Sequence, residues 1–136
     1  YGIMDLSQDL LVYAGAATLS PLLFMPGEEQ PLVGEGKGYP LGMFEESTYE
    51  NRELPFPQGC SLLLYSDAIT EGKTRGGDRL EERGVINVAA GCLKMAPREQ
   101  LVTSIAEELN KILKMPLADD LTIVCATRSS KPGSMT

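Results

Sequence analysis

Residues 60–67, with the sequence CSLLLYSD, are the stretch of this chain that decides its fold. Side chains of an extended strand alternate between its two faces, so consecutive apolar residues place hydrophobic side chains on both faces. A strand of this kind is typical of the middle of a sheet that is covered on both sides. The sequence therefore predicts a central, buried strand that ends at a carboxylate, Asp67.

Shorter strands are predicted on both sides of this segment. Residues 9–15 and 20–25 are apolar runs with polar boundaries, and the turn residues 26–29 that follow them favour a hairpin or meander. Residues 49–56 alternate loosely and end among prolines, which is typical of an edge strand. Residues 121–126 form a last apolar run that predicts a final strand.

Two helices are predicted between the central strand and the final one. Residues 79–93 carry an apolar stripe on one face. A second apolar stripe with helical spacing follows Pro97, at Leu101, Ile105, Leu109 and Ile112. Strands joined by turns dominate the first half of the chain, so the order of elements predicts an α+β fold with a mostly antiparallel sheet.

Composition and charge exclude several classes of function. The 136 residues carry a net charge of −7 without a clustered basic stretch, which argues against nucleic-acid binding. No run of about 18 apolar residues is present, so we expect no membrane span. The chain contains no histidine, which excludes Ser-His-Asp and Cys-His catalysis and imidazole-bound zinc. Its 3 cysteines are far apart, and we interpret them as buried free thiols of a cytoplasmic protein.

Two acidic positions adjoin the predicted buried strands. Asp67 follows one apolar strand directly, and Asp119 and Asp120 precede another. Adjacent side chains of an extended chain point to opposite faces, so at most one of the latter two can face Asp67. Two carboxylates that converge from separate strands would form part of a site for a hard divalent cation. The alternative is that Asp67 and Asp119 cap turns.

The chain resembles the SpoIIE-like bacterial branch of the PPM-type metal-dependent protein serine/threonine phosphatases. Residues 62–71 resemble that family's hydrophobic strand followed by Tyr-Thr-Asp-Gly-Val-Thr-Glu, and residues 119–123 resemble its terminal Asp-Asp/Asn-hydrophobic-Thr motif. Residues 40–42 are similar to an upstream Pro-Leu-Gly element. Residues 13–15 and 21–23 resemble the strand around Ala-Gly-His-Pro-Pro. The four elements occur in the family's order.

The resemblance implies a fold, a chemistry and a set of site residues. The fold would be an antiparallel β-sandwich flanked by helices, and the reaction would be phosphoserine or phosphothreonine hydrolysis at two Mn²⁺ or Mg²⁺ ions. Asp67 and Asp119 would be metal ligands, Asp120 would order its loop, and Glu71 would lie next to the site. No catalytic residue other than the metal ligands is implied.

The resemblance also indicates that the chain is one part of a longer domain. Residues 1–128 correspond to the carboxy-terminal part of the phosphatase domain, and residues 129–136 read as a flexible tail. The family's amino-terminal metal ligands would precede Tyr1, so we expect the 136 residues alone to bind metal weakly and to be inactive. Unpaired sheet edges would favour a homodimer.

Two functional hypotheses follow. In the first, the parent protein is a phosphatase, the output domain of a bacterial response regulator, and acts on a phosphorylated anti-sigma-factor antagonist. In the second, the domain is an inactive adaptor that binds a sigma factor or such an antagonist. Ala16 and Ala68 replace a His and a Gly of the family pattern, which favours the second hypothesis. A structural domain without a ligand is a third reading.

Overall fold

The computed structural model describes residues 1–36 and 38–129. It is an α+β structure, as the order of elements predicted. Its strands and helices are β1 (Gly2–Asp5), β2 (Leu10–Tyr13), β3 (Leu22–Phe24), β4 (Leu32–Val33), β5 (Arg52–Pro55), β6 (Ser61–Tyr65), α1 (Asp67–Thr70), α2 (Glu81–Met95), the 3₁₀ turn η1 (Arg98–Gln100), α3 (Leu101–Ile112) and β7 (Ile123–Thr127).

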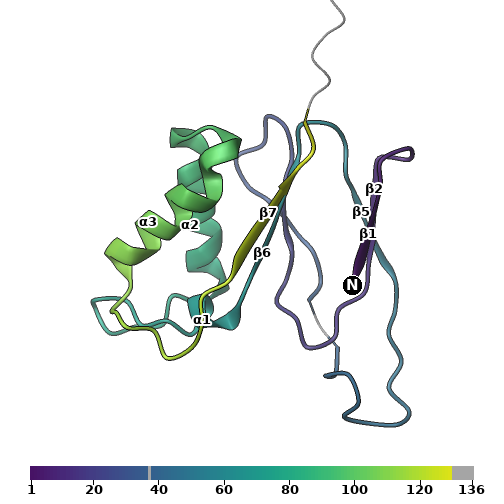
Figure 1. Cartoon of the computed structure of the whole chain (residues 1–136), viewed down its shortest axis with the longest axis horizontal. Helices are drawn as coiled ribbons and strands as arrows, with labels where there is room; N and C mark the ends of the chain where they lie inside the picture. Colours follow the sequence, from purple (N-terminus) through teal and green to yellow (C-terminus); the bar gives the residue numbers. More distant parts are fainter. Residues whose placement is uncertain (37, 130–136) are drawn as a thin grey trace, which may run out of the picture.

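The described strands form two antiparallel sheets. A three-stranded sheet has the order β1-β2-β5, and a four-stranded sheet has the order β4-β3-β6-β7. The sheets lie beside one another, and α2 and α3 cover the face of the four-stranded sheet that points away from the other sheet (Figure 1). The predictions of a central β6 and an edge strand β5 are both confirmed.

The alternation of side chains along β6 and β3 divides the core into two layers. Leu63 belongs to a cluster between the sheet and the helices, whereas Leu62 belongs to a cluster between the two sheets. Neighbouring β3 repeats the pattern, with Phe24 on the helix side and Leu23 on the sheet side. Leu62 and Leu63 are therefore buried in different layers, while Leu64 is exposed.

One expectation about strand pairing is wrong. The runs that contain β2 and β3 do not pair with each other, because β2 lies between β1 and β5 in one sheet and β3 belongs to the other. The chain crosses between the sheets after Tyr13. The turn predicted at residues 26–29 is confirmed, because it joins β3 to β4 in an antiparallel pair that matches Leu23 with Leu32. Gly27 has a φ of 79°, which glycine adopts at little cost.

The close approach of two loops requires a glycine at position 36. A Cβ atom added there would lie 2.3 Å from the backbone carbonyl carbon of Leu19. The Gly-rich segment after β4 is an irregular loop, and no helix begins within the described part of residues 34–51. Figure 1 shows this segment extending away from the body of the molecule.

The three cysteines are free thiols that differ in burial. Cys60 and Cys92 are buried, as predicted, and Cys125 is half-buried. Burial raises the pKa of the Cys60 and Cys92 thiols. In the described part of the chain, no helix has both the length and the apolar character that a membrane crossing needs. The predicted flexible tail falls mainly on residues 130–136, which lie outside the described residues.

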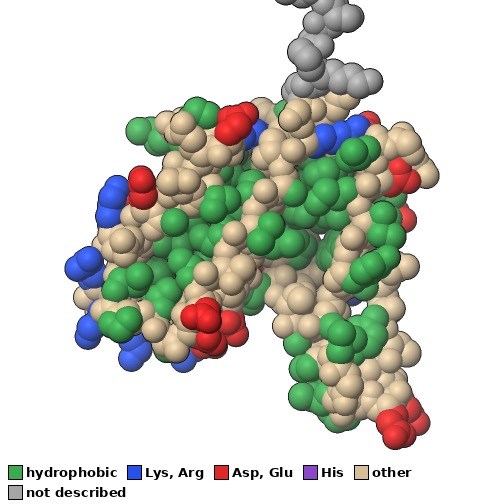
Figure 2. Space-filling model, viewed as in Figure 1, with side chains coloured by type: hydrophobic (Ala, Val, Ile, Leu, Met, Phe, Trp, Pro, Cys, Tyr) green, Lys and Arg blue, Asp and Glu red, His purple; other side chains and the backbone are tan. Residues whose placement is uncertain are grey.

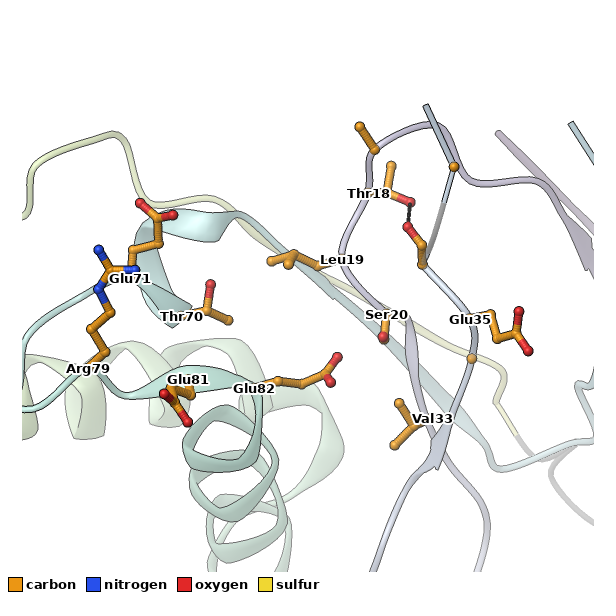
Figure 3. Close-up of a pocket in the computed structure, with 14 residues that line it drawn as sticks. Thr18, Leu19, Ser20, Val33, Glu35, Thr70, Glu71, Arg79, Glu81 and Glu82 are labelled. Carbon is orange, nitrogen blue, oxygen red and sulfur yellow. Dashed lines mark hydrogen bonds between the residues drawn. The ribbon is translucent and has the colours of Figure 1, made fainter. Parts of the chain in front are cut away.

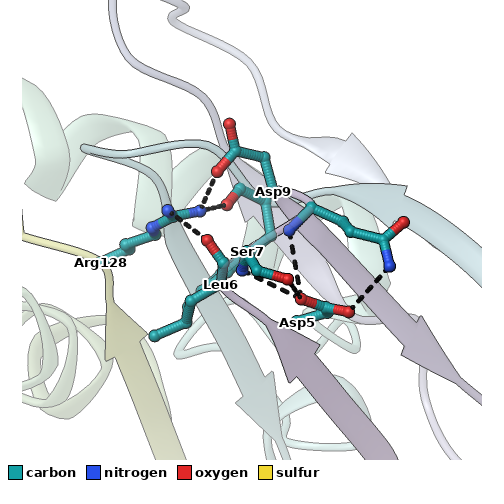
Figure 4. Close-up of polar contacts among 7 residues, drawn as sticks. Asp5, Leu6, Ser7, Asp9 and Arg128 are labelled. Atoms are coloured by element: carbon teal, nitrogen blue, oxygen red, sulfur yellow. Dashed lines mark hydrogen bonds and ion pairs between the residues drawn. The ribbon is translucent and has the colours of Figure 1, made fainter.

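Arg128 joins the two sheets at the end of β7. Its guanidinium donates from Nη1 to the Asp9 carboxylate and to the Phe56 carbonyl, both at 2.6 Å, and from Nη2 to the Leu6 carbonyl at 2.9 Å (Figure 4). Leu6 and Asp9 belong to the β1–β2 connection, and Phe56 follows β5. The side chain is only 13% exposed, so these charge-assisted bonds are shielded from water.

Replacing Arg128 with alanine should destabilise the protein. The substitution leaves two carbonyl groups without their charged donor, and we expect the free energy of unfolding to fall by about 2–3 kcal/mol. Urea denaturation would measure this from the shift of the midpoint at a constant slope. Arg83→Ala, at an exposed position of α2, is the matched control and should change stability by less than about 0.5 kcal/mol. Equal midpoints for the two variants would contradict the assigned role of Arg128.

Candidate functional site

Asp67 is the first residue of the short helix α1, directly after β6. Ser66, at the N-cap position, has φ −86° and ψ 160°, so the extended backbone of β6 continues up to the helix. The carboxylate of Asp67 is exposed, while the next two residues of α1, Ala68 and Ile69, are buried. The packing of α1 therefore fixes the backbone beneath an acidic side chain that remains accessible.

Ala68 has an ordinary helical conformation. It lies within α1, and its φ is not positive. The replacement of the family's glycine by Ala68 therefore requires no backbone conformation that only glycine adopts easily. Alanine is a good helix former, so its presence after Asp67 is no sign of a relaxed site.

The second acidic position lies in the loop before β7. The Asp119 side chain accepts a hydrogen bond from the backbone N–H of Asp120, with a distance of 2.7 Å to Oδ1. This bond holds one carboxylate oxygen against the backbone and leaves the other available. Asp119 and Asp120 are both exposed.

Ser66 connects the two acidic positions. Its hydroxyl donates to the backbone carbonyl of Asp120 at 3.1 Å and accepts from the backbone N–H of Thr122 at 3.0 Å. The backbone N–H of Ser66 also donates to the carbonyl of Thr122 at 3.0 Å. One side chain thus uses its donor and an acceptor to hold the loop of Asp119 beside the start of α1.

Sequence reasoning missed this role of Ser66. The signal was present, because Ser66 stands where the resembled motif has a threonine, and both residues carry a hydroxyl next to the metal-ligand aspartate. The sequence pattern places Ser66 at the end of the predicted strand and gives no further indication of a role for its hydroxyl. The partner atoms belong to the backbone 54 and 56 residues further along the chain, which no local pattern reveals.

A cavity of about 380 Å³ contains the two predicted metal ligands. Asp67 and Asp119 both line it, together with Glu71. Asp120 does not, and its contribution here is the backbone contact with Ser66. The structure therefore brings Asp67, Asp119 and Glu71 to one cavity, while their role as metal ligands stays a prediction. The same cavity is lined by three cations, Lys73, Arg79 and Lys114.

Tyr65 attaches the end of β6 to α2. Its hydroxyl donates to Oε1 of Glu82 at 3.3 Å. Burial, and then the negative charge of Glu82, raise the pKa of Tyr65, so the phenol stays protonated at neutral pH and continues to donate. This contact adds a second constraint, next to Ser66, on the strand end that carries Asp67.

A larger and more open cavity, of about 840 Å³, lies on the other side of α1. Glu71 and Arg79 line this cavity as well as the smaller one. Figure 3 shows both residues on the α1 side, with Thr18 and Glu35 on the loops opposite. Glu81 and Glu82, at the start of α2, make this larger cavity predominantly acidic.

The donor set suits a hard divalent cation. Asp67 and Asp119 offer carboxylate oxygens, which are the ligands that Mg²⁺ and Mn²⁺ prefer, and neither cysteine nor histidine lines the cavity. Within residues 1–36 and 38–129, no group of three or more acidic, cysteine or histidine side chains is placed to surround a metal. The described residues therefore fit part of a metal site.

Comparison with solved structures identifies the fold. The RsbU and RsbW domains of a Mycobacterium tuberculosis protein match with a TM-score of 0.77 at 22% identity, over 94% of this chain and 35% of that one. The manganese-presoaked phosphatase domain of SpoIIE from Bacillus subtilis matches with a TM-score of 0.70 at 17% identity, over 95% of this chain and 55% of that one. The chain therefore has the fold of a PP2C-type (PPM) phosphatase domain.

Sequence comparison gives the family. The family model described as Stage II sporulation protein E (SpoIIE) matches residues 1–129, so the chain belongs to this family. Phosphoserine phosphatase RsbU from Bacillus subtilis is 27% identical over 94 residues, which cover 69% of this chain and 28% of that protein. The chain thus spans less than a third of that relative and 35% to 55% of the two solved chains.

Ser66→Ala should loosen the loop that carries Asp119. The Thr122 amide would lose the acceptor of its hydrogen bond, and we expect its hydrogen exchange to accelerate about fivefold, the equivalent of about 1 kcal/mol. Exchange followed by NMR measures this amide directly. Ser66→Thr keeps the hydroxyl and should preserve slow exchange. An unchanged exchange rate in Ser66→Ala would show that Ser66 does not hold this loop.

Proposed function

We propose that this chain forms part of the active site of a protein phosphatase that hydrolyses phosphoserine or phosphothreonine. The observation that carries the proposal is the meeting of Asp67 and Asp119 at one cavity, with Ser66 hydrogen-bonded between their segments. Membership of the SpoIIE family and similarity to a phosphoserine phosphatase support the choice of reaction.

In this proposal the two aspartates hold Mn²⁺ or Mg²⁺. Such an ion supplies positive charge that stabilises the charge developing on a transferred phosphoryl group. The contribution of the chain is to position the ligands. β6 fixes Asp67 at a strand end, and the bond from the Asp120 amide orients the carboxylate of Asp119. Neither ligand depends on a flexible side-chain network.

The biological setting is a further part of the proposal. The similarity to RsbU and SpoIIE supports a role in sigma-factor regulation. The substrate would then be a phosphorylated anti-sigma-factor antagonist, and the domain would serve as the output of a response regulator. Sequencing or inspection of the coding region around these 136 residues would test the last point, since a receiver domain should precede them.

A second candidate is a catalytically inactive adaptor that binds a sigma factor or an anti-sigma-factor antagonist. It is favoured by Ala16, which stands where the resembled family pattern has a histidine. Divalent cations of this type take about six oxygen ligands, so the two aspartates alone leave most positions to water or to other residues. The two candidates differ in whether the full-length protein turns over substrate.

Metal binding by the chain should depend on Asp67 and Asp119 but not on Asp120. We expect Mn²⁺ to bind with a dissociation constant on the order of 10⁻⁴ to 10⁻³ M, as is typical of sites with few protein ligands. Asp67→Asn and Asp119→Asn should each weaken binding roughly tenfold or more, because each removes a charged ligand. Isothermal titration calorimetry measures the constants.

The matched control for this titration is Asp120→Asn. It removes a carboxylate one residue away from Asp119 and keeps the backbone carbonyl that Ser66 contacts. We expect it to bind Mn²⁺ like the unaltered chain. Binding that survives Asp67→Ala, or that Asp120→Asn weakens as much as Asp119→Asn does, would refute the ligand assignment.

Activity should require the full-length protein that contains residues 1–136. We expect it to release phosphate from a phosphoserine protein in the presence of Mn²⁺, and Asp67→Asn should reduce the rate at least about a hundredfold, since the metal supplies several kcal/mol of stabilisation. The 136-residue chain alone should show no turnover. If the full-length protein binds the phosphorylated partner but never releases phosphate, the adaptor reading is correct and the phosphatase reading fails.

A further inference from the structure

Three cations share the smaller cavity with Asp67 and Asp119. Lys73, Arg79 and Lys114 all line it, although the whole protein carries a net charge of −7. Figure 2 shows Lys and Arg side chains gathered at the lower left corner of the molecule, over the loops next to α1 and α3, with acidic side chains beside them. The cavity is therefore lined by as many cations as carboxylates, since Asp67, Glu71 and Asp119 face Lys73, Arg79 and Lys114, although the protein as a whole is acidic.

Backbone pairing holds the three cations in place. Lys73 and Arg79 are partners in an antiparallel β-bridge, and the backbone N–H of Lys114 donates to the carbonyl of Lys73 at 2.8 Å. A second bridge, between Thr74 and Leu113, joins the same two segments. The Cα positions of the cations are thus set by a small ladder that connects the loop after α1 with the loop after α3.

The cations of this cavity are not used in ion pairs within the described chain. No acidic group of residues 1–36 or 38–129 lies within 4.0 Å of Lys73, Arg79 or Lys114. Lys94, Lys111 and Arg128, by contrast, each pair with a carboxylate. If the three cations served as counterions of Asp67, Asp119 or Glu71, direct pairs would be expected in the cavity that they share.

We propose that Lys73, Arg79 and Lys114 form a binding site for a phosphoryl dianion, directly beside the carboxylate pair. Guanidinium groups bind phosphate through two parallel N–H···O bonds, and lysines add point charges. The location of this site next to a metal centre rests on the proposed function, but its affinity for anions does not. With a substrate in place, the cations would hold the phosphoryl oxygens that face away from the metal-binding carboxylates.

In this arrangement the three cations should have opposite effects on the binding of phosphate and on the binding of a metal ion. Positive side chains attract phosphate but repel a divalent cation, and both effects are strongest at short range. Removing a cation should therefore weaken phosphate binding while leaving Mn²⁺ binding unchanged or tighter. A side chain that merely supported the fold would weaken both.

The test uses the 136-residue chain with Asp67→Asn and Asp119→Asn, so that the outcome does not depend on metal binding. Titration with orthophosphate, followed by NMR, should show saturable binding at millimolar concentrations. Each of Lys73→Gln, Arg79→Gln and Lys114→Gln should weaken it about three- to tenfold, and the triple variant should abolish it. Arg83→Gln, at an exposed position outside the cavity, is the matched control and should have no effect.

The possible outcomes decide the proposal. The proposal is supported if the triple variant loses phosphate binding while Arg83→Gln keeps it. Retention of phosphate binding in Lys73→Arg and Lys114→Arg also supports it, because these variants keep the charges. The arginine variants provide this test even if a glutamine variant fails to fold. Absence of saturable binding, or binding that the triple variant retains, overturns it. Phosphoserine as a second probe separates two sources of the anion. If the triple variant binds both orthophosphate and phosphoserine more weakly, the result supports a substrate site. If only the binding of orthophosphate weakens, the result overturns the substrate site in favour of a site for free phosphate.

The proposed metal site is checked separately in the chain with both aspartates present. Lys114→Gln should bind Mn²⁺ at least as tightly as the unaltered chain does, and a weaker affinity would overturn the opposition between the two sets of charges. If the full-length protein releases no phosphate from a phosphoserine protein while phosphate binding by the chain follows the cations, the proposed function fails and the anion site stands. The two inferences can therefore fail independently.

Discussion

The burial of β6 on both of its faces is the constraint on which the rest of this structure depends. Leu63 faces the helices and Leu62 faces the second sheet, so the strand cannot shift by one residue without exchanging the two layers. Its register therefore fixes the position of the residue where it ends. Asp67 stands at that end, and the site inherits its rigidity from the core.

The parts of the fold that could be predicted from the sequence are those whose pattern lies within one short segment of the chain. The central strand and α3 have local signatures, an unbroken apolar run and a helical stripe at Leu101, Ile105 and Leu109, and both were predicted. The pairing of β2 and β3 was predicted wrongly because neighbouring apolar runs do not show which sheet each joins. Their position next to apolar strands made Asp67, Asp119 and Asp120 candidates, and family resemblance then assigned Asp67 and Asp119 as metal ligands.

The features that sequence reasoning did not find all join distant segments through polar contacts. Ser66 contacts the backbone of Asp120 and Thr122, and the ladder through Lys73 brings three cations together from two loops. Serine and lysine are common surface residues, so their identity alone carries no information about such roles. The site thus has a scaffold that the apolar pattern encodes and a polar lining that only the folded chain reveals.

The two buried cysteines lie in different layers of the core. Cys60 belongs to the cluster between the sheets, and Cys92 belongs to the cluster beneath the helices. Because burial raises the pKa of both thiols, neither is a good nucleophile while the protein is folded. Cys60 is 0% exposed, so a thiol-directed reagent can reach it only when the two sheets separate, whereas Cys92 is 9% exposed and lines a cavity between α2 and α3. The rate at which Cys60 reacts therefore records how often the two sheets part.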